Sequence, residues 1–281
     1  MAQPVYLRPT RVEDALRALA GSPLSVLAGG TDFYPARVGR PVREDILDIT
    51  DLSPLRGIVH EGQGWRIGAL TTWTDLIDHP LPAAFQGLKL AAREVGGHQI
   101  QNAATVAGNL CNASPAADGI PPLMALAAEV ELASLQGVRR VPLADFVTGN
   151  RSTARRSDEL VSAVLVPSHG ARSRSAFLKL GARRYLVISI VMVAVTFNVS
   201  EDGMIVRAGV AVGACSPTAR PIPALEARLV GRPLSSDLAD LVRPSDLSVL
   251  TPISDVRATA DYRLDAALTL IRRALREAGS E

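Results

Sequence analysis

Strand-like and helix-like patterns of hydrophobic residues alternate in the first 57 residues of the chain. Short apolar runs predict strands at 5–7 and 25–28, and a third strand is expected at 44–49. Between the first two runs, residues 11–19 have helical spacing, and Thr10 stands where it could cap this helix. A helix between strands is typical of a small α/β unit.

The middle of the chain shows both the strand-like and the helix-like pattern of hydrophobic residues. Alternation predicts a strand at 65–70, and two further strands at 129–133 and 138–141 flank a Gln-Gly turn like a hairpin. Helical spacing is clear at 85–95 and resumes at 121–128. We therefore expect a mixed α and β structure after the first unit.

A Ser- and Arg-rich stretch at 168–175 predicts a linker, and we place a domain boundary there. Three apolar runs at 176–179, 186–199 and 204–214 predict strands, and a Glu-Asp-Gly turn joins the last two. Helices are expected in the C-terminal part, where an apolar stripe runs through residues 264–275.

Composition and charge exclude several classes of protein. The chain has 281 residues, of which 47% are hydrophobic, so it can bury a sizeable core. Lys and Arg number 30 against 28 Asp and Glu, and the net charge of +2 gives no reason to expect nucleic-acid binding. The longest apolar run, at 185–197, is too short to span a bilayer, and the N-terminus lacks a signal-peptide pattern, so no membrane insertion is expected.

The two cysteines, Cys111 and Cys215, are far apart and have no neighbouring CxxC or His pair. We therefore expect no disulfide framework, zinc site or iron–sulfur cluster in this chain. The four histidines show no paired arrangement for general-base or metal work. The sequence predicts a cytoplasmic protein with no metal site.

Two glycines directly follow the apolar run at 25–28. With Thr31 and Asp32, Gly29 and Gly30 form a turn whose backbone N–H groups can point to one place, where a phosphate could approach without meeting a side chain. The alternative is a plain turn in which Thr31 or Asp32 caps the next helix. Neither a Rossmann GxGxxG fingerprint nor a Walker P-loop is present.

A second group of small residues lies between 99 and 118, a stretch without aromatic residues that we do not expect to be an ordinary core element. Thr105, Gly108 and Asn109 offer hydrogen-bond donors there without a cationic side chain. Close packing alone is the alternative for one such loop. Two such loops, with Asp118 as a hydroxyl acceptor, favour a nucleotide that carries a diphosphate and a ribose or ribityl group.

Motifs along nearly the whole chain resemble those of a known family, in the same order. They are YLRP at 6–9, LAGGTD at 27–32, RIGALTT at 66–72, QIQN at 99–102, TVAGN at 105–109, NASPAAD at 112–118, PL at 142–143, DELV at 158–161, FLK at 177–179, ISDVR at 253–257 and DYR at 261–263. The sequence therefore resembles the FAD-binding medium subunits of molybdenum hydroxylases. That family includes the flavin subunits of carbon monoxide dehydrogenase and the flavin domain of xanthine dehydrogenase.

The resemblance implies an α+β fold with an α/β N-terminal part. Two N-terminal subdomains, at 1–57 and 58–170, would form an FAD-binding domain of the PCMH/vanillyl-alcohol-oxidase type. A C-terminal flavoprotein domain at 176–281 would contain a three-stranded antiparallel sheet and a helical bundle.

The resemblance also implies a set of cofactor-binding residues. They are Leu27, Ala28, Gly29, Gly30, Thr31, Asp32, Phe33, Thr105, Ala107, Gly108, Asn109, Ser114, Asp118, Val161 and Lys179. Asp118 would bind a sugar or ribityl hydroxyl, Val161 would lie against the flavin rings, and Lys179 would sit near the flavin. The alternative for Lys179 is a solvated charge at a strand edge.

The function implied by the resemblance is electron transfer, with FAD carrying the redox chemistry. Electrons would come from [2Fe-2S] clusters in a small partner subunit and pass to an external acceptor that the sequence does not identify. Substrate would be oxidised in a large partner subunit that holds the molybdenum cofactor. Two copies of each of the three subunits, a dimer of heterotrimers, are the implied assembly.

Three positions depart from the family pattern. Ala107 stands where the second loop usually has the first of two glycines, Val187 stands where Asp or an aromatic residue is common near the flavin, and Gln101 stands where Arg is common. If residue 107 required a positive φ, the methyl group would cost about 1–2 kcal/mol. Two alternatives therefore stay open: an assembly or scaffold subunit that has lost tight FAD binding, and a self-standing FAD-dependent oxidoreductase.

Overall fold

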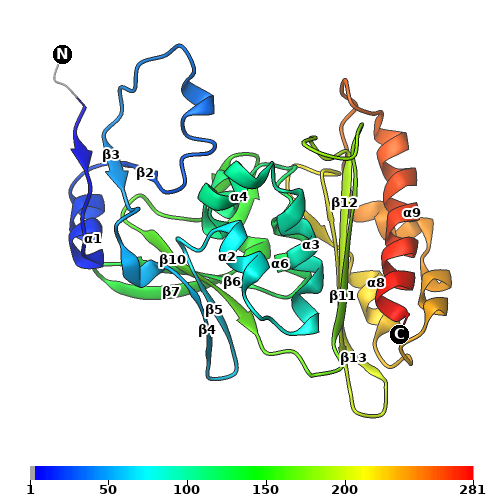
Figure 1. Cartoon of the computed structure of the whole chain (residues 1–281). Coiled ribbons are helices and arrows are strands. Elements are labelled where there is room, and N and C mark those ends of the chain that lie inside the picture. The colour runs from blue at the N-terminus through cyan, green and yellow to red at the C-terminus, as the bar shows by residue number, and fades with distance from the viewer. Residues whose placement is uncertain (1–3, 281) are drawn as a thin grey trace.

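The computed structural model describes residues 4–280, which form three sheet-based groups arranged side by side (Figure 1). The N-terminal strands lie at one end, a larger sheet with several helices lies in the middle, and a sheet covered by helix α9 lies at the other end. This combination of parallel and antiparallel sheets with helices confirms the predicted α+β fold. The domain bounds given above stay a prediction.

A small parallel sheet begins the fold. It has the order β1 (Tyr6–Leu7), β3 (Ile46–Asp48), β2 (Ser25–Leu27), and helix α1 (Val12–Gly21) connects β1 to β2. These elements lie where the apolar runs predicted them. The predicted cap is wrong, because the helix begins later than expected: Arg11 is the N-cap residue, its side chain makes no capping hydrogen bond, and Thr10 lies outside the helix.

Five antiparallel strands form the central sheet in the order β4-β5-β10-β6-β7. Their bounds are Ile58–Glu61 for β4, Gly64–Gly68 for β5, Glu129–Ser134 for β6, Gly137–Pro142 for β7 and Leu160–Pro167 for β10. The predicted hairpin of β6 and β7 is confirmed. The sequence pattern did not predict β10, because this central strand is buried along most of its length and does not alternate.

Short helices pack around the central sheet. They are α2 (Trp73–Asp78), α3 (Gln86–Glu94), α4 (His98–Ala103), α5 (Val106–Asn112), α6 (Ile120–Ala125) and α7 (Leu143–Phe146), with a short hairpin of β8 (Val147–Gly149) and β9 (Ser152–Thr153). The expectation that 99–118 is not a core element is wrong. Val106, Ala107 and Leu110 of α5 are buried, because small apolar side chains let a helix pack closely against its neighbours.

The third sheet is antiparallel, with the order β11 (Arg174–Leu180), β12 (Val191–Val199), β13 (Ile205–Gly213), β14 (Arg220–Pro221). The three predicted strands are present, and the turn at 201–203 joins β12 to β13 as expected. The sheet differs from the predicted three strands by the two-residue strand β14. Residues 186–190 precede β12 instead of belonging to it.

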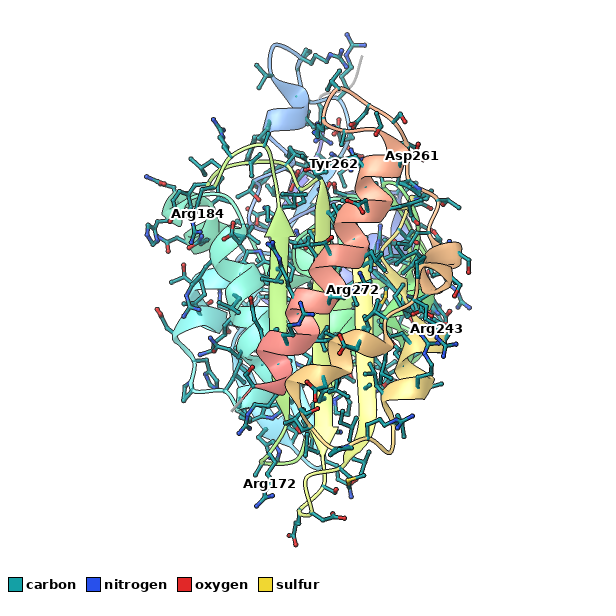
Figure 2. All side chains as sticks on the ribbon, turned by 90° about the vertical axis from the view of Figure 1, so that its right-hand side faces the viewer. Arg172, Arg184, Arg243, Asp261, Tyr262 and Arg272 are labelled. Atoms are coloured by element: carbon teal, nitrogen blue, oxygen red, sulfur yellow. The ribbon has the colours of Figure 1, made fainter. Side chains whose placement is uncertain are left out.

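Helices cover both faces of this third sheet. Helix α9 (Ala260–Gly279) lies along the outer face (Figure 2), near α8 (Pro223–Leu229), and α3 and α6 lie against the inner face. Val193 and Val195 of β12 belong to the outer core, and Met192 and Ala194 belong to the inner one. In the part of the chain that the structure describes, no helix has both the length and the apolar character needed to cross a membrane.

Glu159, just before the central strand β10, connects the loop that precedes this strand to the edge strand β7. Its buried carboxylate accepts hydrogen bonds from Nε of Arg139 at 2.5 Å and from the backbone N–H of Arg156 at 2.7 Å. The hydrogen bond from Arg139 holds the pKa of this carboxyl below its ordinary value. The charged form is therefore the one that stabilises the folded chain.

We expect Glu159→Gln to lower the free energy of unfolding by about 1.5 kcal/mol at pH 7. Because the folded pKa is depressed, this contribution is present above the unfolded pKa of about 4.3 and is lost as the pH falls through the lower folded pKa. The difference from the wild type should therefore shrink in urea unfolding measured below about pH 4. Glu201→Gln, in an exposed turn, is the control and should unfold like the wild type at both pH values.

Candidate cofactor site

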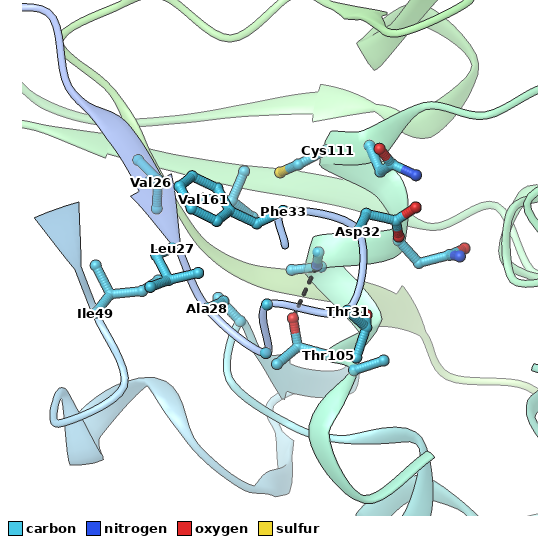
Figure 3. A pocket seen from close by; sticks show the side chains of 18 of the residues that line it. Val26, Leu27, Ala28, Thr31, Asp32, Phe33, Ile49, Thr105, Cys111 and Val161 are labelled. Atoms are coloured by element: carbon cyan, nitrogen blue, oxygen red, sulfur yellow. Dashed lines mark hydrogen bonds between the residues drawn. The ribbon is translucent and has the colours of Figure 1, made fainter. Parts of the chain in front are cut away.

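A cavity of about 660 Å³ lies between the turn that follows β2, the start of α5 and the end of the central sheet at β10 (Figure 3). Its volume lies in the range typical of small-molecule sites. Most of the cofactor-binding residues implied by the sequence line it. They are Leu27, Ala28, Gly29, Gly30, Thr31, Asp32, Phe33, Thr105, Ala107, Gly108, Asn109 and Val161.

The turn at 29–33 offers backbone donors to this cavity. Among the residues that the structure describes, none accepts a hydrogen bond from the backbone N–H groups of 29–33. Gly30 has φ +72°, a conformation that favours glycine. A side chain on Gly29 would lie 1.9 Å from the carbonyl oxygen of Ala103, so only glycine fits this close approach of two backbone segments. Consecutive free N–H groups in a turn of this kind can form an anion-binding nest.

The second predicted loop is the beginning of helix α5. Thr105 is its N-cap residue, and its Oγ1 accepts a hydrogen bond from the N–H of Gly108 at 3.0 Å (Figure 3, dashed line). A β-bridge between Thr72 and Thr105 and the hydrogen bond from the N–H of Val106 to the carbonyl oxygen of Thr71 fix this start in place. Thr105 is therefore used as a cap, an interpretation that the sequence pattern did not contain.

Ala107 lies within α5 and is not among the residues with positive φ. Because its backbone is helical, the methyl group causes no backbone strain, and it is buried in the core. We expect Ala107→Gly to leave FAD affinity within about twofold of the wild type. It should lower the free energy of unfolding by about 1 kcal/mol, the usual cost of glycine in a helix. Thermal unfolding and FAD titration of the variant check both statements; a large gain in affinity would contradict them.

Apolar side chains line the cavity beside this turn. Val26, Ile49, Phe33 and Val161 surround it in Figure 3, and Val161 comes from the central strand β10. Such a surface can hold a flat aromatic ring system, whereas the turn at 29–33 can hold an anion. The cavity thus offers two kinds of environment side by side, as a large nucleotide cofactor with a diphosphate requires.

Several lining residues were missed by sequence reasoning. Arg37, Arg151 and Arg155 add positive charge to the cavity lining. Arg37 also forms an ion pair with Glu44 and lies 3.7 Å above the centre of the Phe33 ring. The many arginines of the chain gave no signal that singled these out.

Three implied residues do not line the cavity. Asp118 and Lys179 face each other, with Lys179 Nζ 2.8 Å from Oδ2 of Asp118, and Ser189 Oγ donates to Oδ1 at 2.8 Å. Burial raises the pKa of the Asp118 carboxyl despite the opposing charge of Lys179. The Lys179 side chain is 6% exposed, so the alternative of a solvated charge is wrong. Ser114 accepts a turn hydrogen bond from the N–H of Ala116.

The other two departures from the family pattern also lie outside the cavity lining. Gln101 is buried on α4 and donates from Nε2 to the carbonyl oxygen of Arg93 at 3.1 Å. Val187 lies in the loop between β11 and β12, where it contacts Gly181 and lines a separate shallow groove. Neither substitution changes the cavity wall directly.

The cavity residues fit FAD by two observations of this structure. The free N–H groups at 29–33 match a diphosphate, and two buried polar atoms of the lining, Nε1 of Trp73 and Oδ1 of Asn109, have no hydrogen-bond partner in the described part of the chain. Within residues 4–280 no group of three or more His, Cys, Asp or Glu side chains is placed to hold a metal ion.

Two family models match the chain. The FAD binding domain in molybdopterin dehydrogenase matches residues 1–169, and the CO dehydrogenase flavoprotein C-terminal domain matches residues 176–278. The nicotinate dehydrogenase FAD-subunit of Eubacterium barkeri is 30% identical over 95% of this chain and 93% of its own length. The xanthine dehydrogenase FAD-binding subunit of Escherichia coli is 32% identical over 97% of this chain and 95% of its own length.

A solved structure shares the arrangement of the whole chain. Reconstituted CO dehydrogenase from Oligotropha carboxidovorans contains a chain that is 28% identical, with a TM-score of 0.88 over 99% of this chain and 98% of that one.

Proposed function

The chain belongs to the family of FAD-binding medium subunits of molybdenum hydroxylases, and we propose that it binds one FAD in the cavity and transfers electrons within such a complex. The unpartnered N–H groups of 29–33, next to the apolar wall that includes Val161, are the observation that carries this proposal. Bound FAD supplies the redox chemistry.

The chain's own residues bind and orient the cofactor. The turn at 29–33 holds the diphosphate, with Gly108 and Asn109 on its other side, and Thr105 fixes the start of α5. Val26, Ile49 and Val161 exclude water from the rings. Asp118 and Lys179 support the site from behind the lining, where the pair joins the central part of the fold to β11.

The partners belong to the proposal as well. The relatives are named as FAD subunits, medium subunits and medium chains, so the chain acts within a larger enzyme. We propose a large partner subunit with the molybdenum cofactor and a small partner with [2Fe-2S] clusters, in a dimer of heterotrimers in the cytoplasm. Two cysteines far apart cannot supply the ligands of such clusters here.

Flavin content and thermal unfolding of the purified chain test the proposal. We expect close to one FAD per chain, released by acid, and a stabilisation of about 2.7 kcal/mol when free FAD is about 100 times its dissociation constant. Absence of flavin and of any stabilisation, with the partner subunits present, would favour the assembly or scaffold alternative. Reduction of the bound flavin by a substrate of the isolated chain would favour a self-standing oxidoreductase.

A further inference from the structure

Residues 34–44 form a flap between the turn at 29–33 and strand β3. Figure 1 shows it as part of the loop between β2 and β3, which projects from the rest of the fold. The flap contains one short 3-10 helix, η1 (Pro35–Arg37), and none of its residues is buried. The side chains of Tyr34 and Val38 are 59% and 82% exposed. The flap therefore adds no side chain to the hydrophobic core.

The hydrogen bonds of the flap stay within residues 30–44. The backbone N–H of Tyr34 donates to the carbonyl oxygen of Gly30 at 3.1 Å, and that of Arg40 donates to the carbonyl oxygen of Arg37 at 2.9 Å. Among the residues that the structure describes, no hydrogen bond or ion pair joins the flap to the sheets or helices around it. Such a segment opens at a lower cost in free energy than the core does.

Arg37 connects the two ends of the flap. Its Nη1 donates to the carbonyl oxygen of Phe33 at 2.7 Å, and its Nε donates to Oε1 of Glu44 at 2.5 Å. The centre of the guanidinium group also lies 3.7 Å from the centre of the Phe33 ring. The side chains of Arg37 and Glu44 are 27% and 35% exposed, and an ion pair that reaches solvent is weak enough to break and form again.

The flap is the part of the cavity wall that has no core behind it. Ala36 and Arg37 line the cavity, whereas Glu44 does not. The wall formed by β10 and α5 belongs to the core, since Val161 and Ala107 are buried. Of these parts of the wall, the flap can therefore move at the lowest cost, and its outward movement widens the cavity.

We propose that the flap opens to admit and release FAD and closes against the bound cofactor, held closed by the ion pair of Arg37 and Glu44. This inference rests on the proposed function. Contacts with FAD add to the internal contacts of the flap only in its closed state, so the cofactor shifts the flap toward that state. Opening of the flap then sets the rate at which FAD leaves. Glu44 acts through Arg37 and is a positioning residue.

Limited digestion of the full chain with trypsin reports on the opening of the flap. Trypsin cleaves after arginine, and the bonds Arg37–Val38 and Arg43–Glu44 lie in the flap. Cleavage of such bonds follows the population of the open form. On saturation with FAD, we expect cleavage at both bonds to slow at least about tenfold. Cleavage after the exposed Arg172, in the loop before β11 and outside the cavity lining, should keep its rate (Figure 2).

The rate of FAD release supplies the second readout, measured as the rise of flavin fluorescence after dilution of the loaded chain. Glu44→Gln should release FAD about threefold to fivefold faster than the wild type, near the upper limit for an exposed ion pair. Glu13→Gln, which removes an exposed ion pair with Arg11 outside the cavity lining, should stay within about 1.5-fold. Glu44→Gln should add nothing to the effect of Arg37→Met, because Glu44 acts through Arg37.

The inference requires both results. If FAD slows cleavage in the flap but Glu44→Gln releases FAD like the wild type, the cofactor only shields a fixed wall. If FAD leaves cleavage in the flap unchanged, the flap does not close on the cofactor. Either result overturns the inference, whereas the proposed function survives because FAD is bound. If the chain binds no FAD even in its complex, the proposed function fails and this inference fails with it.

Discussion

Replacement of Gly29 by alanine is expected to weaken FAD binding at least about 100-fold. The added Cβ would lie 1.9 Å from the carbonyl oxygen of Ala103 and 3.0 Å from Cα of Ala104, both of which are backbone atoms. The turn must therefore move away from α4, and its free N–H groups move with it. Loss of two hydrogen bonds to a charged diphosphate, at about 1.5 kcal/mol each, gives this factor.

The matched control is Gly21→Ala at the end of α1, where a side chain would meet nothing within 4 Å. This variant should bind FAD within about twofold of the wild type. Titration followed by flavin fluorescence measures both, and circular dichroism shows that each variant is folded. Binding by Gly29→Ala within about threefold of the wild type would mean that the turn at 29–33 does not hold the diphosphate.

The sequence predicted elements best where one face of the element meets solvent or where turn residues are distinctive. The hairpin of β6 and β7 and the turn between β12 and β13 lie where the pattern placed them. Strand β10 was missed because burial on both faces removes the alternation that identifies a strand. Helix α5 was missed because small side chains in a polar-looking stretch can still be buried in a helix, and α4 was missed because its mostly exposed polar residues show no apolar period.

For single residues of the candidate site, too, the sequence indicated local features and missed those that depend on contacts between distant parts of the chain. Gly29 and Gly30 could be recognised because two adjacent glycines directly after an apolar strand indicate a tight turn with accessible backbone N–H groups. Arg37, Arg151 and Arg155 were not recognisable, because the chain contains many other arginines and no local pattern separates the three that line the cavity. The pairing of Asp118 with Lys179 spans two parts of the fold, so spacing along the sequence could not indicate it.

Lys179→Met should be the most destabilising substitution among those considered. It should lower the free energy of unfolding by about 3–5 kcal/mol at pH 8. Lys179 and Asp118 form an ion pair whose side chains are 6% and 11% exposed, and removal of the lysine leaves a buried carboxylate without its cation. Ser189 still donates to that carboxylate, but a neutral hydroxyl does not replace the charge. The loss also weakens the connection between the central part of the fold and β11.

The pH dependence separates this cause from a simple loss of packing. Burial already raises the folded pKa of Asp118, and without Lys179 it should rise further above the unfolded value of about 3.9. The folded variant then binds a proton more tightly than the unfolded chain, so its stability falls as the pH rises from the unfolded toward the folded pKa. The difference in the free energy of unfolding between the wild type and Lys179→Met should therefore be smaller at pH 5 than at pH 8.

Lys89→Met is the matched control, since Lys89 and Lys179 are the only lysines of the chain. Lys89 Nζ donates to the carbonyl oxygens of Ile77 at 2.8 Å and His79 at 2.5 Å, and it has no carboxylate partner within ion-pair distance in the described part of the chain. Its replacement should cost about 1 kcal/mol, equally at pH 5 and pH 8. The double variant Lys179→Met/Asp118→Asn should recover part of the stability lost by Lys179→Met, because it removes the uncompensated charge. Equal losses for the two single lysine variants at pH 8 would contradict a stabilising role of the buried pair.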